Sequence, residues 1–232
     1  MAAINLEDCP TIAPLSCGKG VYVVVLLHGL GSDGNDLIDL GRGWAPSMIK
    51  AEFLAPHAPF PCDFGGPGRQ WFSMQDCAPD SLYAGVQTAA PVLDAFLDKI
   101  LAERRLTDRH LALVGFSQGA MMALHVGLRR PNPPACIVAI AGQLHGARDL
   151  SGEIRSKPPV LLIHGDQDPV VPYAEMGKAK AALKDLGVPV KSCTRPGVDH
   201  TIDDDAADAA GEFLAAHLTA PKPGAKPEDH AP

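Results

Sequence analysis

Short, unbroken apolar runs recur along the chain and are separated by longer segments of mixed polarity. Because the runs are continuous instead of alternating, they are typical of strands that are buried on both faces of a parallel sheet. The run over residues 21–27 is rich in β-branched side chains, which favours a strand further. The pattern predicts strands over residues 21–27, 52–55, 111–114, 135–140, 160–164 and 190–194.

Several of the intervening segments carry the period of an amphipathic helix. The longest covers residues 81–105, where Pro91 predicts either a kink or a division into two helices. Further helices are expected directly after residue 117 and near residues 173–186 and 203–218. This alternation of strands and helices predicts an α/β fold, with a mostly parallel central sheet and helices on both faces.

Two segments are rich in proline and glycine and carry no clear period. Residues 1–20 are expected to form an edge hairpin or a loose entry segment. Residues 55–69 lead into the apolar stretch Gln70-Trp-Phe-Ser-Met74, and long irregular loops in compact domains are usually functional or disordered. We favour a lid or wall of a substrate pocket, with Trp71 as a substrate-binding residue. The alternative is that Trp71 fills the core, as most tryptophans do.

A serine stands at the sharpest predicted turn of the chain, in Leu111-Ala-Leu-Val-Gly-Phe-Ser-Gln-Gly-Ala120. A strand that passes so abruptly into a helix strains the serine backbone and leaves almost no room for side chains two residues away on either side. Gly115 and Gly119 meet that requirement. Gly-x-Ser-x-Gly also occurs by chance, but the strand before it and the helix after it favour an elbow that exposes the Ser117 hydroxyl as a nucleophile.

The first strand leads directly into a glycine-rich loop, His28-Gly-Leu-Gly-Ser-Asp-Gly34. In hydrolases with a serine elbow, a loop at this place supplies one N–H to the developing oxyanion, and the residue after the serine supplies the other. This assigns the main-chain N–H groups of Leu30 and Gln118 to an oxyanion hole. The alternative is an ordinary glycine-rich turn between a strand and a helix.

A serine hydroxyl is a weak nucleophile and needs a base that is itself oriented by an acid. On folds with this elbow the chain order is serine, acid, histidine, with the last two on loops after later strands. Asp168 and His200 fit that order after Ser117. Asp166 is the alternative acid; we prefer Asp168 because it lies past the glycine turn and is followed by Pro169.

Other polar residues near these positions have competing interpretations. His28 and His164 lie at strand ends and are interpreted as structural, whereas Asp199 could compete for the imidazole that follows it. The spacing His164-x-Asp166-x-Asp168 resembles a metal site, but no further histidine or carboxylate joins it. No metal and no cofactor are therefore expected.

Taken together, these motifs follow the order of a known family. They are His28-Gly-Leu-Gly, Ala55-Pro-His-Ala-Pro, Arg69-Gln-Trp-Phe72, Gly115-Phe-Ser-Gln-Gly119, His164-Gly-Asp-Gln-Asp-Pro-Val-Val-Pro172 and a histidine on the last loop. Over about residues 15–218 the sequence resembles the phospholipase/carboxylesterase family, which includes the acyl-protein thioesterases. The resemblance implies a compact α/β hydrolase fold without a large cap domain, acting on esters or thioesters of short to medium acyl chains, sometimes on lysophospholipids, and often as a homodimer.

Length and composition limit the remaining possibilities. At 232 residues and 46% hydrophobic content, the chain can bury one sizeable core, so we expect a single domain over residues 1–218 and a disordered tail over residues 219–232. A net charge of -7 without a basic cluster argues against a nucleic-acid partner. The six widely spaced cysteines are expected to be reduced.

Neither the N-terminus nor the longest apolar run predicts insertion into a membrane. The N-terminus lacks the charged and apolar regions of a secretory signal, and the run over residues 21–27 is too short to span a bilayer. We expect a cytoplasmic protein without stable membrane insertion.

The residues favour a serine esterase that uses Ser117, His200 and Asp168 and forms an acyl-enzyme. Acyl-protein thioesterase and lysophospholipase activities on the same site are alternatives, since the sequence does not define the depth of the pocket. A silent hydrolase-fold binding module is a further alternative, although such a protein would normally have lost one of the three residues. A dienelactone-type hydrolase would require cysteine at the elbow.

Overall fold

The computed structural model describes residues 3–218, and the predicted tail over residues 219–232 lies outside that range. Within it, one main sheet has the strand order β1-β3-β2-β6-β7-β8-β9, and all neighbouring pairs are parallel except β1 with β3. Its strands are β1 Thr11–Ile12, β2 Tyr22–Leu27, β3 Ala51–Leu54, β6 Leu111–Phe116, β7 Cys136–Ile140, β8 Val160–Gly165 and β9 Val190–Arg195. The predicted mostly parallel sheet is confirmed.

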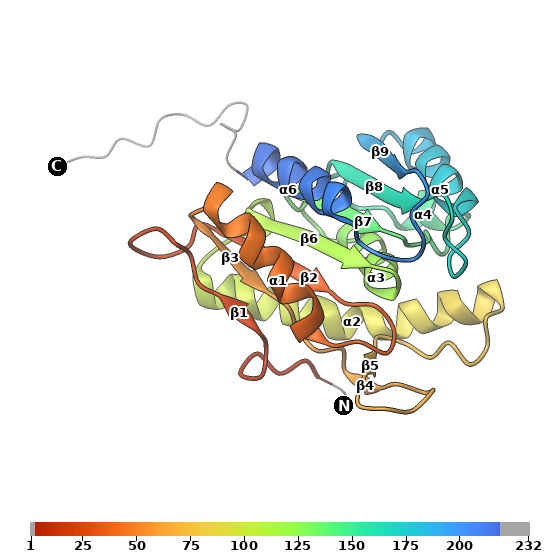
Figure 1. Cartoon of the computed structure of the whole chain (residues 1–232), viewed down its shortest axis with the longest axis horizontal. Coiled ribbons are helices and arrows are strands. Elements are labelled where there is room, and N and C mark those ends of the chain that lie inside the picture. The colour runs from red at the N-terminus through yellow and green to blue at the C-terminus, as the bar shows by residue number, and fades with distance from the viewer. Residues whose placement is uncertain (1–2, 219–232) are drawn as a thin grey trace.

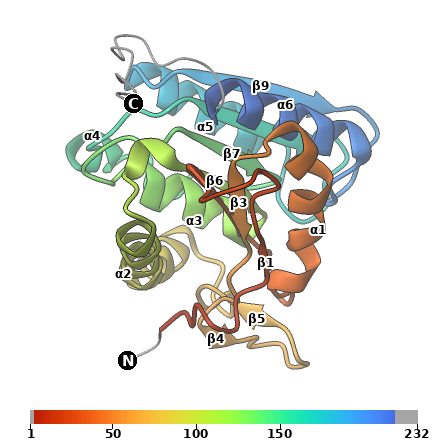
Figure 2. The same ribbon diagram turned by 90° about the vertical axis from the view of Figure 1, so that its left-hand side faces the viewer.

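Helices cover both faces of this sheet (Figures 1 and 2). They are α1 Gly34–Trp44, α2 Pro79–Arg104, α3 Gln118–Gly127, α4 Leu150–Glu153, α5 Ala174–Asp185 and α6 Asp204–Leu218, with short 3-10 turns at Ala45–Ser47 and Asp108–His110. Apolar residues of α2, α3 and α5 share one core cluster with Val23 and Val25 of β2. Those of α1 and α6 share the other cluster with Val24 and Leu26. Successive residues of a strand point to opposite faces, so a continuously apolar strand supplies both clusters.

Two irregular regions differ from the sequence expectation. The expectation that residues 55–69 contain no strand was wrong, because β4 Phe60–Pro61 pairs with β5 Arg69–Gln70 as a small antiparallel sheet. Strands of two residues are too short to produce a hydrophobic period, and the guanidinium of Arg69 holds the pair in place by donating to the carbonyls of Ala58 (2.7 Å) and Pro59 (2.8 Å). Within residues 1–20, β1 forms an antiparallel edge strand along β3.

Helix α2 continues through Pro91 as one helix, so a division into two helices does not occur. Pro91 is exposed, and buried apolar residues precede and follow it on the face that packs in the core, from Leu82 to Leu101. Burial on both sides of the proline holds the helix together despite the lost hydrogen bond.

No helix in residues 3–218 is both long enough and apolar enough to cross a membrane. The thiols of the six cysteines are free, and Cys136 and Cys193 lie in β7 and β9 as predicted.

A buried arginine joins α2 to the chain that follows α3. The Arg130 side chain is 4% exposed and donates to Asp94 (2.6 Å) and Asp98 (2.6 Å) of α2, and its Nε donates to Asp108. Arg130→Met should lower the free energy of unfolding by about 3–5 kcal/mol, because it leaves the buried Asp108 carboxylate without its ion-pair partner. Urea denaturation followed by circular dichroism measures the change.

The matched control is Arg42→Met, since Arg42 pairs with Asp39 where both side chains are mostly exposed. Exposed pairs contribute little, so this variant should unfold at nearly the wild-type urea concentration. Equal midpoints for the two variants would contradict a stabilising role for the Arg130 cluster.

Candidate active site

Loops at the carboxyl ends of the parallel strands meet at one edge of the sheet, the usual place for a binding site in such folds. Ser117 lies there, between β6 and α3, with φ 53° and ψ −118°. This positive φ is unfavourable for any residue with a side chain and costs about 1–3 kcal/mol. The predicted strained elbow is therefore present.

Both glycines of the elbow are sterically required. A Cβ at Gly115 would lie 2.2 Å from the carbonyl oxygen of Gly119, and a Cβ at Gly119 would lie 1.9 Å from that of Leu27. Either contact is far inside van der Waals distance, so a side chain at either position would push α3 away from the sheet. Both positions therefore require glycine, as the sequence predicts for the neighbours of a strained elbow.

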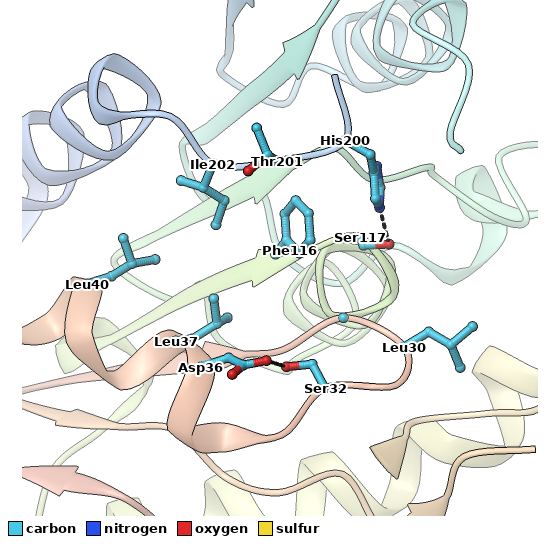
Figure 3. Close-up of a pocket in the computed structure, with 11 residues that line it drawn as sticks. Leu30, Ser32, Asp36, Leu37, Leu40, Phe116, Ser117, His200, Thr201 and Ile202 are labelled. Carbon is cyan, nitrogen blue, oxygen red and sulfur yellow. Dashed lines mark hydrogen bonds between the residues drawn. The ribbon is translucent and has the colours of Figure 1, made fainter. Parts of the chain in front are cut away.

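The structure brings Ser117, His200 and Asp168 together in one hydrogen-bonded chain. The Oγ of Ser117 lies 2.9 Å from Nε2 of His200 (Figure 3). On the other side of the ring, Nδ1 of His200 lies 2.7 Å from Oδ2 of Asp168. Since a carboxylate can only accept, Nδ1 carries the proton and Nε2 is free to accept from the serine hydroxyl. His200 comes from the loop after β9 and Asp168 from the loop after β8.

The Asp168 carboxylate is fully enclosed and held by several donors. Its Oδ1 accepts from the backbone N–H groups of Val170 (2.8 Å) and Val171 (2.9 Å). Burial alone would raise the pKa of Asp168, but the hydrogen bonds from His200 and from these two backbone groups outweigh it and lower the pKa below its usual value. Asp168 is therefore ionised at neutral pH and can orient an imidazole.

The competing residues take other roles. Asp166 accepts from the backbone N–H of Gly197 at 2.7 Å, and Asp199 is exposed. His164 is buried, with Nε2 2.9 Å from the carbonyl of Val171 and 3.2 Å from Asp168 Oδ2, so it lies behind the carboxylate and not beside the serine. Among the described residues, no group of three or more metal-binding side chains is arranged to hold an ion.

The two candidate oxyanion donors flank the serine. Gly29 packs so closely on the elbow that a Cβ there would lie 3.3 Å from the Cβ of Ser117, and Leu30 follows it into the same cleft. Gln118 is the first residue of α3. Within residues 3–218 the main-chain N–H groups of Leu30 and Gln118 donate to no carbonyl or side chain. Both are therefore available to donate to an anionic oxygen.

Trp71 does not line the cleft, in contrast to the substrate-binding role expected from the sequence. Its side chain is 1% exposed, and its Nε1–H donates to the carbonyl oxygen of His28 at 2.9 Å. An indole with its apolar surface buried and its one donor satisfied by the backbone belongs to the core, which was the alternative interpretation. The chain before it forms the small β4–β5 sheet.

A cleft of about 370 Å³ opens beside Ser117 and His200 (Figure 3). Apolar side chains form much of its wall, and Ser32 and Asp36 form a polar edge where the Ser32 hydroxyl donates to the Asp36 carboxylate. The further lining residues are Leu30, Leu37, Leu40, Phe116, Thr201 and Ile202. Sequence reasoning missed this wall because it assigned no helix to residues 34–44; the signal was the spacing of Leu37, Leu40 and Trp44 directly after the glycine-rich loop.

Comparisons with known proteins identify the family that this chain resembles. A family model described as Phospholipase/Carboxylesterase matches residues 16–218. Acyl-protein thioesterase 1 of Neurospora crassa is 28% identical over 238 residues, covering 92% of this chain and 94% of its own length. Esterase YpfH of Escherichia coli is 28% identical over 203 residues, covering 86% of this chain and 84% of its own.

Solved structures extend the similarity to the fold. The crystal structure of esterase PE8 is 44% identical, has a TM-score of 0.88, and covers 93% of this chain and 100% of its own. The predicted α/β-hydrolase fold class is confirmed by this similarity and by the family match.

Proposed function

Because the chain belongs to the phospholipase/carboxylesterase family of ester-bond hydrolases, we propose that it is a serine carboxylesterase in which Ser117 is the nucleophile, His200 the general base and Asp168 the residue that orients it. The observation that carries the proposal is the unbroken hydrogen-bonded chain from the Ser117 hydroxyl through His200 to Asp168. No cofactor enters the reaction.

Acylation begins when Nε2 of His200 takes the Ser117 proton and Oγ bonds to the carbonyl carbon of the ester. The carbonyl oxygen becomes anionic and accepts hydrogen bonds from the backbone N–H groups of Leu30 and Gln118. As the intermediate collapses, the bond to the alcohol oxygen breaks and His200 returns the proton to that oxygen. The acyl group is then held as an ester of Ser117.

Deacylation repeats the same steps with water. His200 takes a proton from water, the hydroxide attacks the acyl carbon, and the proton returns to Ser117 Oγ as the acid leaves. Asp168 keeps its charge throughout and stabilises the imidazolium, which its lowered pKa supports.

The apolar cleft supports acyl chains of short to medium length as the substrates. Similarity to esterase PE8 at 44% identity favours oxygen esters over thioesters, since the thioesterase relatives are 28% identical. Acyl-protein thioesters and lysophospholipids are the second candidates, because the same nucleophile and oxyanion donors would act on them. The homodimer and the cytoplasmic location stay predictions.

A series of p-nitrophenyl esters tests the substrate class. We expect the highest kcat/KM for acetate and butyrate and a steady fall towards long chains. Ile202→Trp, which narrows the cleft, should lower kcat/KM for the octanoate about 10-fold more than for the acetate. Ile49→Trp is the matched control, because Ile49 is 49% exposed and lies outside the cleft. If Ile202→Trp lowered kcat/KM equally for all chain lengths, the acyl chain would bind outside this cleft.

A further inference from the structure

Three buried polar side chains connect the two backbone segments that carry the oxyanion donors. His28, Trp71 and Gln118 are 0%, 1% and 0% exposed. His28 precedes the glycine-rich loop, Gln118 follows the nucleophile, and Trp71 lies between them in space although it is far from both in the sequence. Buried polar side chains with all their hydrogen bonds made hold a single arrangement of the backbone.

The His28 ring fixes the peptide that carries the Leu30 N–H. Its Nε2 accepts from the backbone N–H of Ala58 at 3.0 Å, so the ring proton is on Nδ1, which donates to the carbonyl oxygen of Gly29 at 2.7 Å. In a trans peptide the C=O and the following N–H point in opposite directions. Holding the Gly29 carbonyl on the His28 side therefore turns the Leu30 N–H the other way.

The Gln118 side chain fixes the segment that carries the second oxyanion donor, by binding it to the backbone of Trp71 and Phe72. Its Oε1 accepts from the Trp71 backbone N–H at 2.7 Å, and its Nε2 donates to the carbonyl of Phe72 at 2.8 Å. The amide can make both bonds in only one orientation, because a flip would set donor against donor and acceptor against acceptor. The Trp71 indole N–H then donates to the His28 carbonyl at 2.9 Å and completes the connection.

We propose that His28, Trp71 and Gln118 act as positioning residues: their side chains form one hydrogen-bonded frame that holds the Leu30 and Gln118 N–H groups at the oxyanion position. This inference rests on the proposed esterase function and extends it. The loop after β2 is rich in glycine, so the Gly29–Leu30 peptide has conformational freedom and could turn its carbonyl to the serine. The frame removes that freedom before the substrate binds, so no reorganisation is needed at the transition state.

Trp71→Phe is the most selective test, because it removes the indole N–H and keeps an aromatic ring in the core. Loss of one oxyanion donor costs up to about 10²–10³ in kcat, and loosening one should cost about 10-fold or more, with KM within about 2-fold. Gln118→Met is the second variant, since it removes the side-chain bonds and keeps the main-chain N–H. Steady-state kinetics on p-nitrophenyl butyrate measure both.

Inhibition by butaneboronic acid separates positioning from stability. A boronic acid bound to a serine places an oxygen at the oxyanion position, so its inhibition constant should rise in each variant by the same factor as kcat falls. A variant that was merely less stable would keep the wild-type inhibition constant, and it would keep the wild-type kcat once kcat is expressed per folded molecule. Thermal unfolding of each sample gives the folded fraction.

Trp44→Phe is the matched control. Trp44 is also buried, and its Nε1–H donates to the carbonyl of Ala207 at 2.9 Å, on the other face of the sheet. The Trp44→Phe variant should be less stable than the wild type and should have the wild-type kcat. The frame is refuted if Trp71→Phe and Gln118→Met match Trp44→Phe in kcat and boronic acid binding, or if they raise KM and leave kcat unchanged. Absence of Ser117-dependent hydrolysis in the wild type would instead refute the proposed function.

Discussion

Replacing Ser117 by alanine is expected to reduce kcat for p-nitrophenyl butyrate by a factor of about 10⁴ or more. The hydroxyl oxygen is the atom that bonds to the acyl carbon, and Nε2 of His200 has no other hydroxyl within hydrogen-bonding distance in the described residues. KM should change little, since the apolar cleft and the oxyanion donors remain. Stopped-flow and steady-state assays of the purified variant measure the loss.

Ser156→Ala is the matched control for that experiment. Ser156 is 4% exposed and donates to the carbonyl of Gly127 at 3.0 Å, at the opposite end of α3 from the nucleophile. This variant should keep wild-type kcat. Wild-type turnover in Ser117→Ala would exclude Ser117 as the nucleophile and assign the catalysis to another residue.

Asp168→Asn should lower kcat by about 10⁴-fold while leaving the fold unchanged. An amide presents an N–H donor to Nδ1 of His200, so the ring must carry its proton on Nε2 and can no longer accept from Ser117. The bonds that Oδ1 accepts from Val170 and Val171 can be kept by the amide oxygen. The effect should therefore appear in kcat and in its dependence on pH, more than in the melting temperature.

Asp166→Asn provides the comparison, because Asp166 stands two residues earlier and was the alternative acid. Its Oδ1 accepts from Gly197 and not from His200, and asparagine keeps that acceptor. We expect kcat within a few-fold of the wild type. If Asp166→Asn were the more damaging substitution, the orienting role would belong to Asp166.

The serine elbow and the buried strands could be predicted from the sequence because both depend on residues that are close together in the chain. Gly115 and Gly119 stand where the backbone leaves no room for a Cβ, and that requirement depends only on the turn itself. The continuous apolar runs likewise follow from burial on both faces of the sheet. The loops that carry Ser117, Asp168 and His200 meet because they follow the carboxyl ends of parallel strands.

The features that sequence reasoning missed depend on contacts between distant residues. The burial of Trp71 depends on acceptors at His28 and Gln118, which no local pattern relates to it. The β4–β5 pair is held by the Arg69 side chain across a glycine-rich loop, and two-residue strands have no period of their own. The cleft wall on α1 is an exception, since the spacing of Leu37, Leu40 and Trp44 was a local signal that was overlooked.

The most direct test of Ser117 as the nucleophile is covalent labelling with a p-nitrophenyl alkylphosphonate, a reagent that phosphonylates an activated serine. We predict that one equivalent abolishes esterase activity, that activity and free Ser117 decline together, and that peptide mapping by mass spectrometry finds the phosphonyl group on Ser117. Esterase activity that persists after Ser117 is fully phosphonylated, or inactivation by a group attached to a different residue, would contradict it.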